Sequence, residues 1–269
     1  MTKVIIAGAA GRMGRRIGYM VNEHPGLQVA AGFERPDSPE VGRDMGELGG
    51  YGSTGIKVAA GLAAVIDQGD VIIDFTFHEA TMQMARVAAE KGRAMVIGTT
   101  GLSQENLQEL ADRAKKFPCV QAPNMAVGVN VLFKVAAKMA SILGNDYDME
   151  IVEAHHRMKK DAPSGTALKL GELMAQAVGR DLETVGVFSR HGMIGERTDR
   201  EIGIQTVRAG DIVGEHTVYF AGAGELLEIT HRAHSRDNFA RGAALAAAWI
   251  AKQPNGLYTM FDVLGLQDL

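Results

Sequence analysis

The chain has 269 residues, of which 46% are apolar and 22% charged, a composition typical of folded globular proteins and not of disordered or fibrous ones. A formal net charge of −4 argues against a broad basic surface for nucleic acid. The single cysteine, Cys119, excludes an intramolecular disulfide and favours a reducing compartment. The first residues run straight into an apolar strand pattern without the features of a signal peptide, and the apolar stretch 243–251 is about half of the ~20 residues of a membrane span. We therefore expect a cytoplasmic protein without nucleic-acid or membrane partners.

The first half of the sequence alternates short β-branched runs with helical patterns, which predicts a parallel sheet covered by helices. Strands are expected at residues 4–7, 29–33, 71–75, 95–97 and 120–122, and helices at 12–22, 79–91 and 104–115. Gly92 is expected to end the second helix and Ser103 to cap the third. The glycine-rich stretch 42–55 is expected to form a long, mobile excursion.

After residue 124 the pattern changes. A helix is expected at 129–143, a strand at 149–153, a polar loop, and a helix at 166–177. Further strands at 184–189, 202–208, 216–220 and 226–231 are close enough in sequence to form mostly antiparallel pairs. An alanine-rich helix at 236–250 is expected to return to the first domain. The sequence thus predicts an α/β protein, with a Rossmann-type doubly wound parallel sheet (residues 1–126 and 236–269) and a second α+β substrate domain (residues 127–235).

Three glycines, Gly8, Gly11 and Gly14, follow the first strand and open into a helix, so that backbone amides could close on a pyrophosphate. The pattern is looser than the strict dinucleotide motif, which has glycine where this chain has Ala9. Glu34 stands at the end of the second strand, where an acid can bind the adenosine ribose, and Arg35 could instead meet a 2′-phosphate. NADH and NADPH both remain possible. The alternative interpretation is a tight turn beside a surface acid.

The densest chemical stretch lies between residues 150 and 167. It offers two imidazoles and three further cations before a helix start, a combination suited to a substrate with two carboxylates. Ser164 is a good N-cap, so the amides of Gly165 and Thr166 are expected to point towards an anion. A solvated charged loop before a capped helix is the plainer alternative. A zinc site is disfavoured because adjacent histidines without suitably spaced partners make poor joint ligands.

Five segments together carry a family resemblance. The run EIVEAHHRMKKDAPSGTA (150–167), with GAAGRMG (8–14), DFT (74–76), VIGTTG (96–101) and VRAGDIVGEHTV (207–218), resembles the 4-hydroxy-tetrahydrodipicolinate reductase family over nearly the whole chain. The resemblance implies hydride transfer from NADH or NADPH to the cyclic imine derived from 4-hydroxy-2,3,4,5-tetrahydrodipicolinate, in lysine and diaminopimelate biosynthesis. It also implies a homotetramer mediated by strands of the second domain, and closure of the two domains over cofactor and substrate.

The resemblance assigns roles residue by residue. His155 is the expected acid and Lys159 its partner in proton donation, because hydride addition pushes negative charge onto the ring nitrogen. The expected substrate contacts are His156, Gly165 and Thr166. The expected cofactor contacts are Gly8, Ala9, Ala10, Gly11, Arg12, Met13, Glu34, Arg35, Gly98, Thr99, Thr100, Ala122, Pro123, Asn124 and Met125. Some relatives place a basic residue directly after the DFT segment, whereas this chain has Phe77 and then His78, which leaves NADPH preference open.

Two other functions compete with this one. A semialdehyde dehydrogenase also uses a Rossmann domain but requires a cysteine nucleophile, for which only Cys119 is available. A dinucleotide sensor without turnover would need no acid–base cluster in its second domain. Residues 155–166 therefore favour an enzyme.

Overall fold

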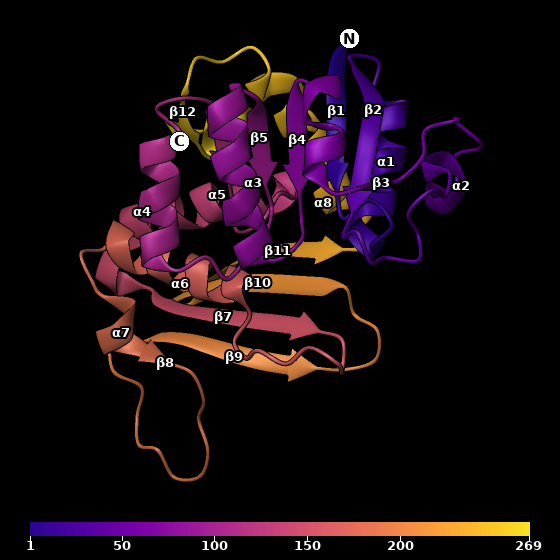
Figure 1. The fold of residues 1–269 in the computed structure, drawn as a ribbon. Helices are drawn as coiled ribbons and strands as arrows, with labels where there is room; N and C mark the ends of the chain where they lie inside the picture. The colour runs from indigo at the N-terminus through magenta and orange to yellow at the C-terminus, as the bar shows by residue number, and fades with distance from the viewer. The chain divides into compact units, whose positions relative to one another are not determined.

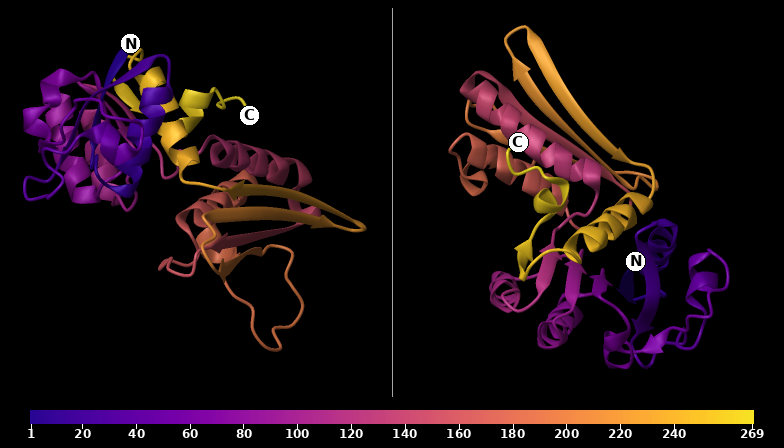
Figure 2. Two further views of the ribbon diagram at one scale, coloured as in Figure 1. Left: turned by 90° about the vertical axis from the view of Figure 1, so that its right-hand side faces the viewer. Right: turned by 90° about the horizontal axis from the view of Figure 1, so that it is seen from above.

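The computed structural model describes residues 1–269, which divide into two compact units. Unit 1 comprises Met1–Val127 and Arg236–Gln267, and unit 2 comprises Gly128–Ser235 with Asp268–Leu269. Figures 1 and 2 show the helices and strands of both units.

Unit 1 is built on a seven-stranded sheet in the order β12-β6-β5-β4-β1-β2-β3. Every neighbouring pair is parallel. The strands are β1 (Thr2–Ala7), β2 (Leu27–Glu34), β3 (Ala59–Ala60), β4 (Val71–Asp74), β5 (Ala94–Ile97), β6 (Pro118–Gln121) and β12 (Gly256–Tyr258). The sheet runs both ways from β1, which confirms the predicted Rossmann-type architecture. The edge strands β3 and β12 are too short to have been found by periodicity.

Helices cover both faces of this sheet, so its strands are buried on two sides. Along β1, Val4 and Ile6 join one core and Ile5 and Ala7 the other. The first core is completed by α1 (Arg12–Glu23) and α8 (Asp237–Ile250), and the second by α3 (His78–Lys91) and α4 (Gln104–Arg113). The short helices of unit 1 are α2 (Met45–Gly49), α9 (Met260–Leu264), η1 (Leu62–Ala64) and η2 (Ile66–Gln68).

Two helix boundaries match the sequence signals. Gly92 ends α3 in the left-handed conformation, with φ +62°. Ser103 caps α4, and its side chain accepts a hydrogen bond from the amide of Asn106 in a capping box. Both predictions are confirmed.

The glycine-rich excursion is held by one buried side chain, Asp44. Its carboxylate accepts hydrogen bonds from the amides of Gly46 and Glu47 at the start of α2, and from the amides of Thr54 and Gly55 beyond it. Burial opposes ionisation, but these amide donors outweigh it and hold the pKa of Asp44 below its usual range. The excursion therefore contains a helix, α2, and a buried charged carboxylate, Asp44, that the sequence analysis did not predict.

Unit 2 contains a five-stranded sheet in the order β11-β10-β7-β9-β8. Its strands are β7 (Asp148–His155), β8 (Gly186–Val187), β9 (Ile202–Arg208), β10 (Gly214–Gly222) and β11 (Glu225–Ala233). β10 is antiparallel to β7 and β11, whereas β9 is parallel to β7 and β8. The prediction of mostly antiparallel pairing was therefore wrong for half of the pairs, because the chain between β7 and β9 contains the helix crossover that a parallel pair requires. Part of the strand expected at 184–189 is also the helix α7 (Leu182–Val185).

Two longer helices complete unit 2. α6 (Gly165–Ala177) packs against β7 and β9, and α5 (Val127–Leu143) continues into η3 (Gly144–Asp146). By length and composition alone, the helical stretch Val127–Asp146 could cross a membrane, whereas the sequence analysis considered only the shorter apolar stretch 243–251. The same composition occurs in core helices of soluble proteins, and α5 buries Leu132, Phe133 and Ala136.

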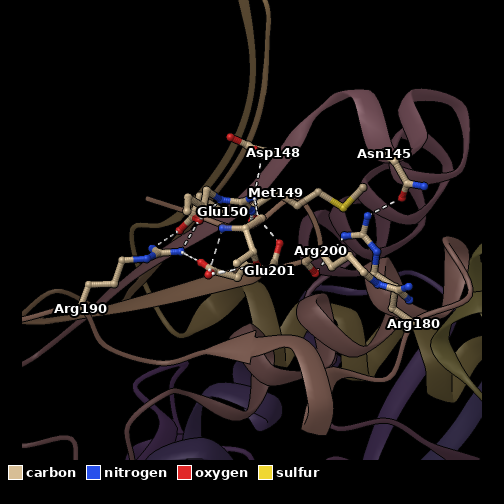
Figure 3. Close-up of polar contacts among 10 residues, drawn as sticks. Asn145, Asp148, Met149, Glu150, Arg180, Arg190, Arg200 and Glu201 are labelled. Atoms are coloured by element: carbon tan, nitrogen blue, oxygen red, sulfur yellow. Dashed lines mark hydrogen bonds and ion pairs between the residues drawn. The ribbon is translucent and has the colours of Figure 1, made fainter. Parts of the chain in front are cut away.

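The chain between β8 and β9 forms a projecting arm, residues 188–201 (Figure 1), and arginines anchor it at its base (Figure 3). Arg190 binds both carboxylate oxygens of Glu150 at 2.8 Å and also reaches Glu201. Arg197 binds Asp148 at 2.6 Å. The arm is therefore tied to β7 through two acids, Asp148 and Glu150, while Met193 and Ile194 near its tip are exposed.

Candidate functional site

The glycine loop of unit 1 has the geometry of an anion site. Gly8 takes φ +61°, and a Cβ on Gly14 would lie 2.1 Å from the Gly8 carbonyl oxygen, so the loop can fold this tightly only with glycine at position 14. Gly11 is the N-cap of α1 and offers no capping side chain. The first-turn amides of Arg12 and Met13 thus have neither an intrahelical nor a side-chain capping partner, as expected where a helix start binds phosphate.

Glu34 and Arg35 lie where the sequence placed them, at the end of β2. A carboxylate oxygen of Glu34 accepts a hydrogen bond from the amide of Ala10 at 3.0 Å, which brings the acid directly beside the glycine loop. The Arg35 side chain is about 80% exposed and its nearest acid is Asp37 at 3.7 Å. Arg35 can therefore be reoriented towards a ligand at little cost, since exposed ion pairs of this kind are weak.

A buried carboxylate, Asp74, holds one further segment that is expected to contact the cofactor. Asp74 ends β4 and accepts hydrogen bonds from the hydroxyls of Thr76, Thr81 and Thr99. Burial raises the pKa of Asp74, and the hydroxyl donors only partly oppose that rise. The contact with Thr99 fixes the segment Gly98, Thr99 and Thr100 that follows β5.

The segment from Ala122 to Met125 follows β6, so three of the expected cofactor segments continue from the carboxyl ends of parallel strands. α8 approaches it closely, since a Cβ on Gly242 would lie 1.8 Å from the Met125 carbonyl oxygen. Within the segment, Asn124 accepts a hydrogen bond from the amide of Ala126. Ala122 and Met125 are buried and Pro123 is exposed.

A surface hollow of about 700 Å³ lies elsewhere in unit 1, lined among others by Thr2, Asp70, Ala94 and Pro118. These residues are at the amino ends of β1, β4, β5 and β6. Ligands of open parallel sheets bind outside the carboxyl ends of the strands, so this hollow is not the dinucleotide site.

In unit 2 the expected acid, His155, is the last residue of β7 and is 12% exposed in its side chain. Its Nδ1 lies 2.6 Å from a carboxylate oxygen of Glu153, and its ring meets that of His216 edge-on at 5.2 Å. Gly214 leaves room for the ring, because a Cβ there would lie 3.0 Å from Nε2 of His155. One nitrogen of the imidazole is thus committed to an acid within the protein.

Glu153 is fully buried and accepts hydrogen bonds from four residues. Arg208, at the end of β9, binds both of its oxygens at 2.8 Å, the amide of Ser164 donates at 2.9 Å and the hydroxyl of Thr206 at 3.2 Å. Burial opposes the charged form, but the donors outweigh it and hold the pKa of Glu153 well below its usual range. The acid is therefore ionised at neutral pH.

The second expected catalytic residue, Lys159, is connected to the same network. Its Nζ lies 2.8 Å from a carboxylate oxygen of Asp161, and the backbone carbonyl of Asp161 accepts a hydrogen bond from Arg208 at 2.6 Å. A chain of polar contacts thus runs from Lys159 through Asp161, Arg208 and Glu153 to His155. The amide of Lys159 donates a hydrogen bond to the carbonyl of His156, so the loop after β7 begins with a turn.

Ser164 caps α6, as predicted: its hydroxyl accepts a hydrogen bond from the amide of Ala167. The same hydroxyl lies 3.1 Å from Nε2 of the buried His216. Gly165 is exposed and open space surrounds the position of its missing Cβ. Thr166 follows it in the first turn of α6, and Nδ1 of His156 is buried without a hydrogen-bond partner.

The sequence analysis gave no role to Glu153, Arg208, Asp161 or His216. The sequence did contain a signal for Glu153. Residues two apart on a strand point to the same face, so Glu153 and His155 had to be neighbours. Arg208 and His216 come into place only through the register of β7 with β9 and β10, which pairs His155 with Arg208 and Glu153 with His216. No local pattern indicates that register.

Comparison with known proteins gives a match over nearly the whole chain. Residues 2–125 match the family model of the dihydrodipicolinate reductase N-terminus, and residues 128–264 that of its C-terminus. This chain belongs to the dihydrodipicolinate reductase family. A 4-hydroxy-tetrahydrodipicolinate reductase of Desulfotalea psychrophila is 66% identical over 269 residues, covering 100% of both chains. A reductase of the same name from Syntrophobacter fumaroxidans is 55% identical over 267 residues, 99% of this chain and 100% of the relative.

Among solved structures, a dipicolinate-bound dihydrodipicolinate reductase from Paenisporosarcina sp. TG-14 is similar, with a TM-score of 0.75 and 25% identity over 97% of this chain and 98% of the other. An amine dehydrogenase from Mycobacterium smegmatis shares the fold, with a TM-score of 0.60 at 15% identity over 96% and 95% of the two chains. The resemblance to the reductase family is thus confirmed by both sequence and fold.

The buried His216 predicts how the stability of the folded chain depends on pH. Burial, and then the charge of His155, lower the pKa of His216 to about 3, whereas an unfolded histidine titrates near 6.5. The unfolded chain therefore binds one more proton between these values, and stability present above pH 6.5 is lost as the pH falls towards 3. The contribution reaches about 1.4 kcal/mol per pH unit well below pH 6.5.

We expect His216→Gln to remove this contribution, so the stability difference between wild type and variant should shrink from pH 7 to pH 5. Unfolding followed by circular dichroism at each pH measures it. The exposed His191 provides the matched control, since His191→Gln should leave the pH dependence unchanged. Parallel pH curves for wild type and His216→Gln would show that His216 takes up its proton in the folded chain.

Proposed function

We propose that this chain is an NAD(P)H-dependent 4-hydroxy-tetrahydrodipicolinate reductase. It transfers a hydride to the cyclic imine derived from 4-hydroxy-2,3,4,5-tetrahydrodipicolinate, giving 2,3,4,5-tetrahydrodipicolinate and water in lysine and diaminopimelate biosynthesis. The relatives of that name cover the full chain at up to 66% identity. The observation that carries the proposal is the contact of the ionised Glu153 with His155, in one network with Lys159. This contact adds a proton donor to a chain that also has a dinucleotide-binding fold.

Each unit has its own role in this proposal. Unit 1 holds the cofactor through the glycine loop, Glu34, Arg35 and the segments 98–100 and 122–125. The loop fits a dinucleotide because the backbone closes around Gly14 and the α1 amides of Arg12 and Met13 are available to a pyrophosphate. Unit 2 holds the substrate: the start of α6 at Gly165 and Thr166 receives one carboxylate, and His156 contributes to binding.

The nicotinamide supplies the hydride when it is bound, and side chains of unit 2 donate the proton. As hydride adds to the ring carbon that is conjugated with the imine, negative charge moves to the ring nitrogen and must be neutralised. The imidazolium of His155 donates its proton to that nitrogen, and the Lys159 ammonium stabilises the developing charge and completes the proton-donating pair. Arg208 pairs with Glu153 and Lys159 with Asp161, so the His155 imidazolium leaves this network with one net positive charge, which suits a substrate carboxylate.

A coupled assay tests this function, following loss of absorbance from NADH or NADPH while the cyclic imine is generated in situ. We expect His155→Ala and Lys159→Ala each to lower turnover by about 10²–10⁴-fold, the range for a positioned acid. If the pair acts as a unit, the double variant should be little worse than the poorer single one. Lys138, exposed on α5, is the control, and Lys138→Ala should keep wild-type turnover. Strictly additive losses would contradict a shared role, and no cofactor consumption by wild type would refute the function.

We further propose that both nicotinamide cofactors are used. Glu34 suits the free ribose hydroxyls of NADH, and the exposed Arg35 can turn towards the extra phosphate of NADPH. Phe77, which stands where some relatives carry a basic residue, is 60% exposed and packs against His78. It contributes no charge, so one contact that would favour NADPH is missing.

Catalytic efficiencies with the two cofactors should therefore lie within about tenfold, or ~1.4 kcal/mol of transition-state binding. Arg35→Ala should weaken NADPH use and spare NADH, and Glu34→Ala should do the reverse. Lys57→Ala, at an exposed position of unit 1, serves as the control for general charge effects. The measurement is kcat/KM for both cofactors on all four proteins. A wild-type preference above a hundredfold, or equal damage to both cofactors in Arg35→Ala, would contradict the assignment.

The assembly that we propose is a cytoplasmic homotetramer, without nucleic-acid or membrane partners. β11 is a nine-residue edge strand whose outer side has no neighbour in the sheet, and its Leu226 and Leu227 are 55% and 41% exposed. Long unprotected edge strands with apolar side chains pair readily with other chains. The tip of the arm adds Met193 and Ile194 as a second exposed apolar surface.

Analytical ultracentrifugation should give a mass close to four times the 28.7 kDa of the chain. Leu226→Glu combined with Leu227→Glu should shift the protein to smaller species, because charges at the edge oppose pairing. The control is Leu257→Glu on β12, an edge strand of unit 1 with a leucine exposed to a similar extent. A tetramer unaffected by the β11 changes would place the interface elsewhere.

A further inference from the structure

The polar contacts around His155 converge on one carboxylate, and we propose that Glu153 is the positioning residue of the proton donor. It fixes His155 with Nδ1 protonated, so that Nε2 is the nitrogen that gives its proton to the substrate. This inference rests on the proposed function for its catalytic meaning, but the fixed tautomer is a property of the chain alone.

The tautomer follows from the charge of Glu153. An ionised carboxylate can only accept hydrogen bonds, and Glu153 is kept ionised by the guanidinium of Arg208 on both of its oxygens and by the amide of Ser164. At 2.6 Å from that carboxylate, Nδ1 of His155 must be the donor. Nε2 lies beside Gly214, where a Cβ would stand 3.0 Å from it, so the missing side chain leaves room for this nitrogen. The imidazole can therefore lose and regain a proton at Nε2 while Nδ1 remains protonated.

Arg208 keeps the carboxylate from rotating. Its guanidinium binds both oxygens of Glu153, a geometry that a single hydrogen bond could not enforce. The same guanidinium binds the carbonyl of Asp161, whose side chain pairs with Lys159. Glu153 thus sets the place of His155 directly and that of the Lys159 loop through Arg208.

The other groups that face His155 are consistent with this role. His216, opposite on β10, has its pKa lowered to about 3 and is neutral, so it adds no competing cation. Thr206 and Ser164 also donate to Glu153, but from β9 and from the start of α6, away from the imidazole. Glu153 is therefore the only acid in hydrogen-bond contact with His155.

The deciding measurement is the tautomer of His155, read by NMR from the imidazole nitrogens of the full chain labelled with ¹⁵N-histidine, without cofactor or substrate. A His155→Gln variant assigns the signal. The test variant combines Glu153→Leu with Arg208→Met, since removing both charges avoids an unpaired buried ion that would unfold the chain. Thr206→Val is the matched control: it removes one hydrogen bond to Glu153 but none to His155.

We expect wild type and Thr206→Val to show neutral His155 protonated at Nδ1, and the double variant to lose that preference. Its kcat/KM should fall by about tenfold or more, yet by less than the ~10²–10⁴-fold loss from removing the acid. Protonation at Nε2 in wild type, or the same tautomer in the double variant, would overturn the inference. If the tautomer shifts as expected but wild type consumes no cofactor, the proposed function fails and the positioning role of Glu153 stands.

Discussion

The buried carboxylate of Glu153 must stay charged where water does not reach it, and much of unit 2 is arranged around that constraint. Donors come from β7, from β9 and from the residue that begins α6. Removing one partner of a buried ion pair leaves an uncompensated charge, which is far more costly than the pair is stabilising. The start of α6, the end of β7 and the end of β9 are therefore held together, and these are the places from which the expected substrate contacts extend.

Unit 1 also contains a fully buried carboxylate, but its hydrogen-bond donors are of a different kind. Asp74 is as deeply buried as Glu153, but its donors are the hydroxyls of Thr76, Thr81 and Thr99 and the amide of Thr76, none of them a cation. Without a guanidinium, burial prevails and the pKa of Asp74 is raised, whereas that of Glu153 is lowered. Asp74 thus fixes the backbone at a strand end through neutral donors alone. The cation next to Glu153 is instead suited to a site for carboxylates.

The sequence predicted the parts of the fold that depend on local pattern. Alternating apolar runs located most strands of the parallel sheet, and Ser103, Gly92 and Ser164 marked helix ends correctly because capping is decided within one turn. The pairing of β7 with β9 was missed, since parallel pairing depends on a crossover longer than any sequence window. Asp44 was missed for a related reason: a lone acid in a glycine-rich stretch has no periodicity, and its role emerges only when six donors close around it.

The two candidate sites differ in what makes them recognisable. The cofactor loop is built from backbone atoms, and it can fold this tightly only where side chains are absent. Glycines at positions 8, 11 and 14 therefore indicate the loop directly in the sequence. The proton-donating site is built from side chains of three strands, and its geometry depends on register. Only the spacing of Glu153 and His155, two residues apart on one strand, is visible in the sequence. Since a one-residue slip of β9 would carry Arg208 to the opposite face of the sheet, the register of β7 with β9 is itself a condition for the acid to be ionised. The folding of this sheet and the chemical state of its central acid are therefore set by the same contacts.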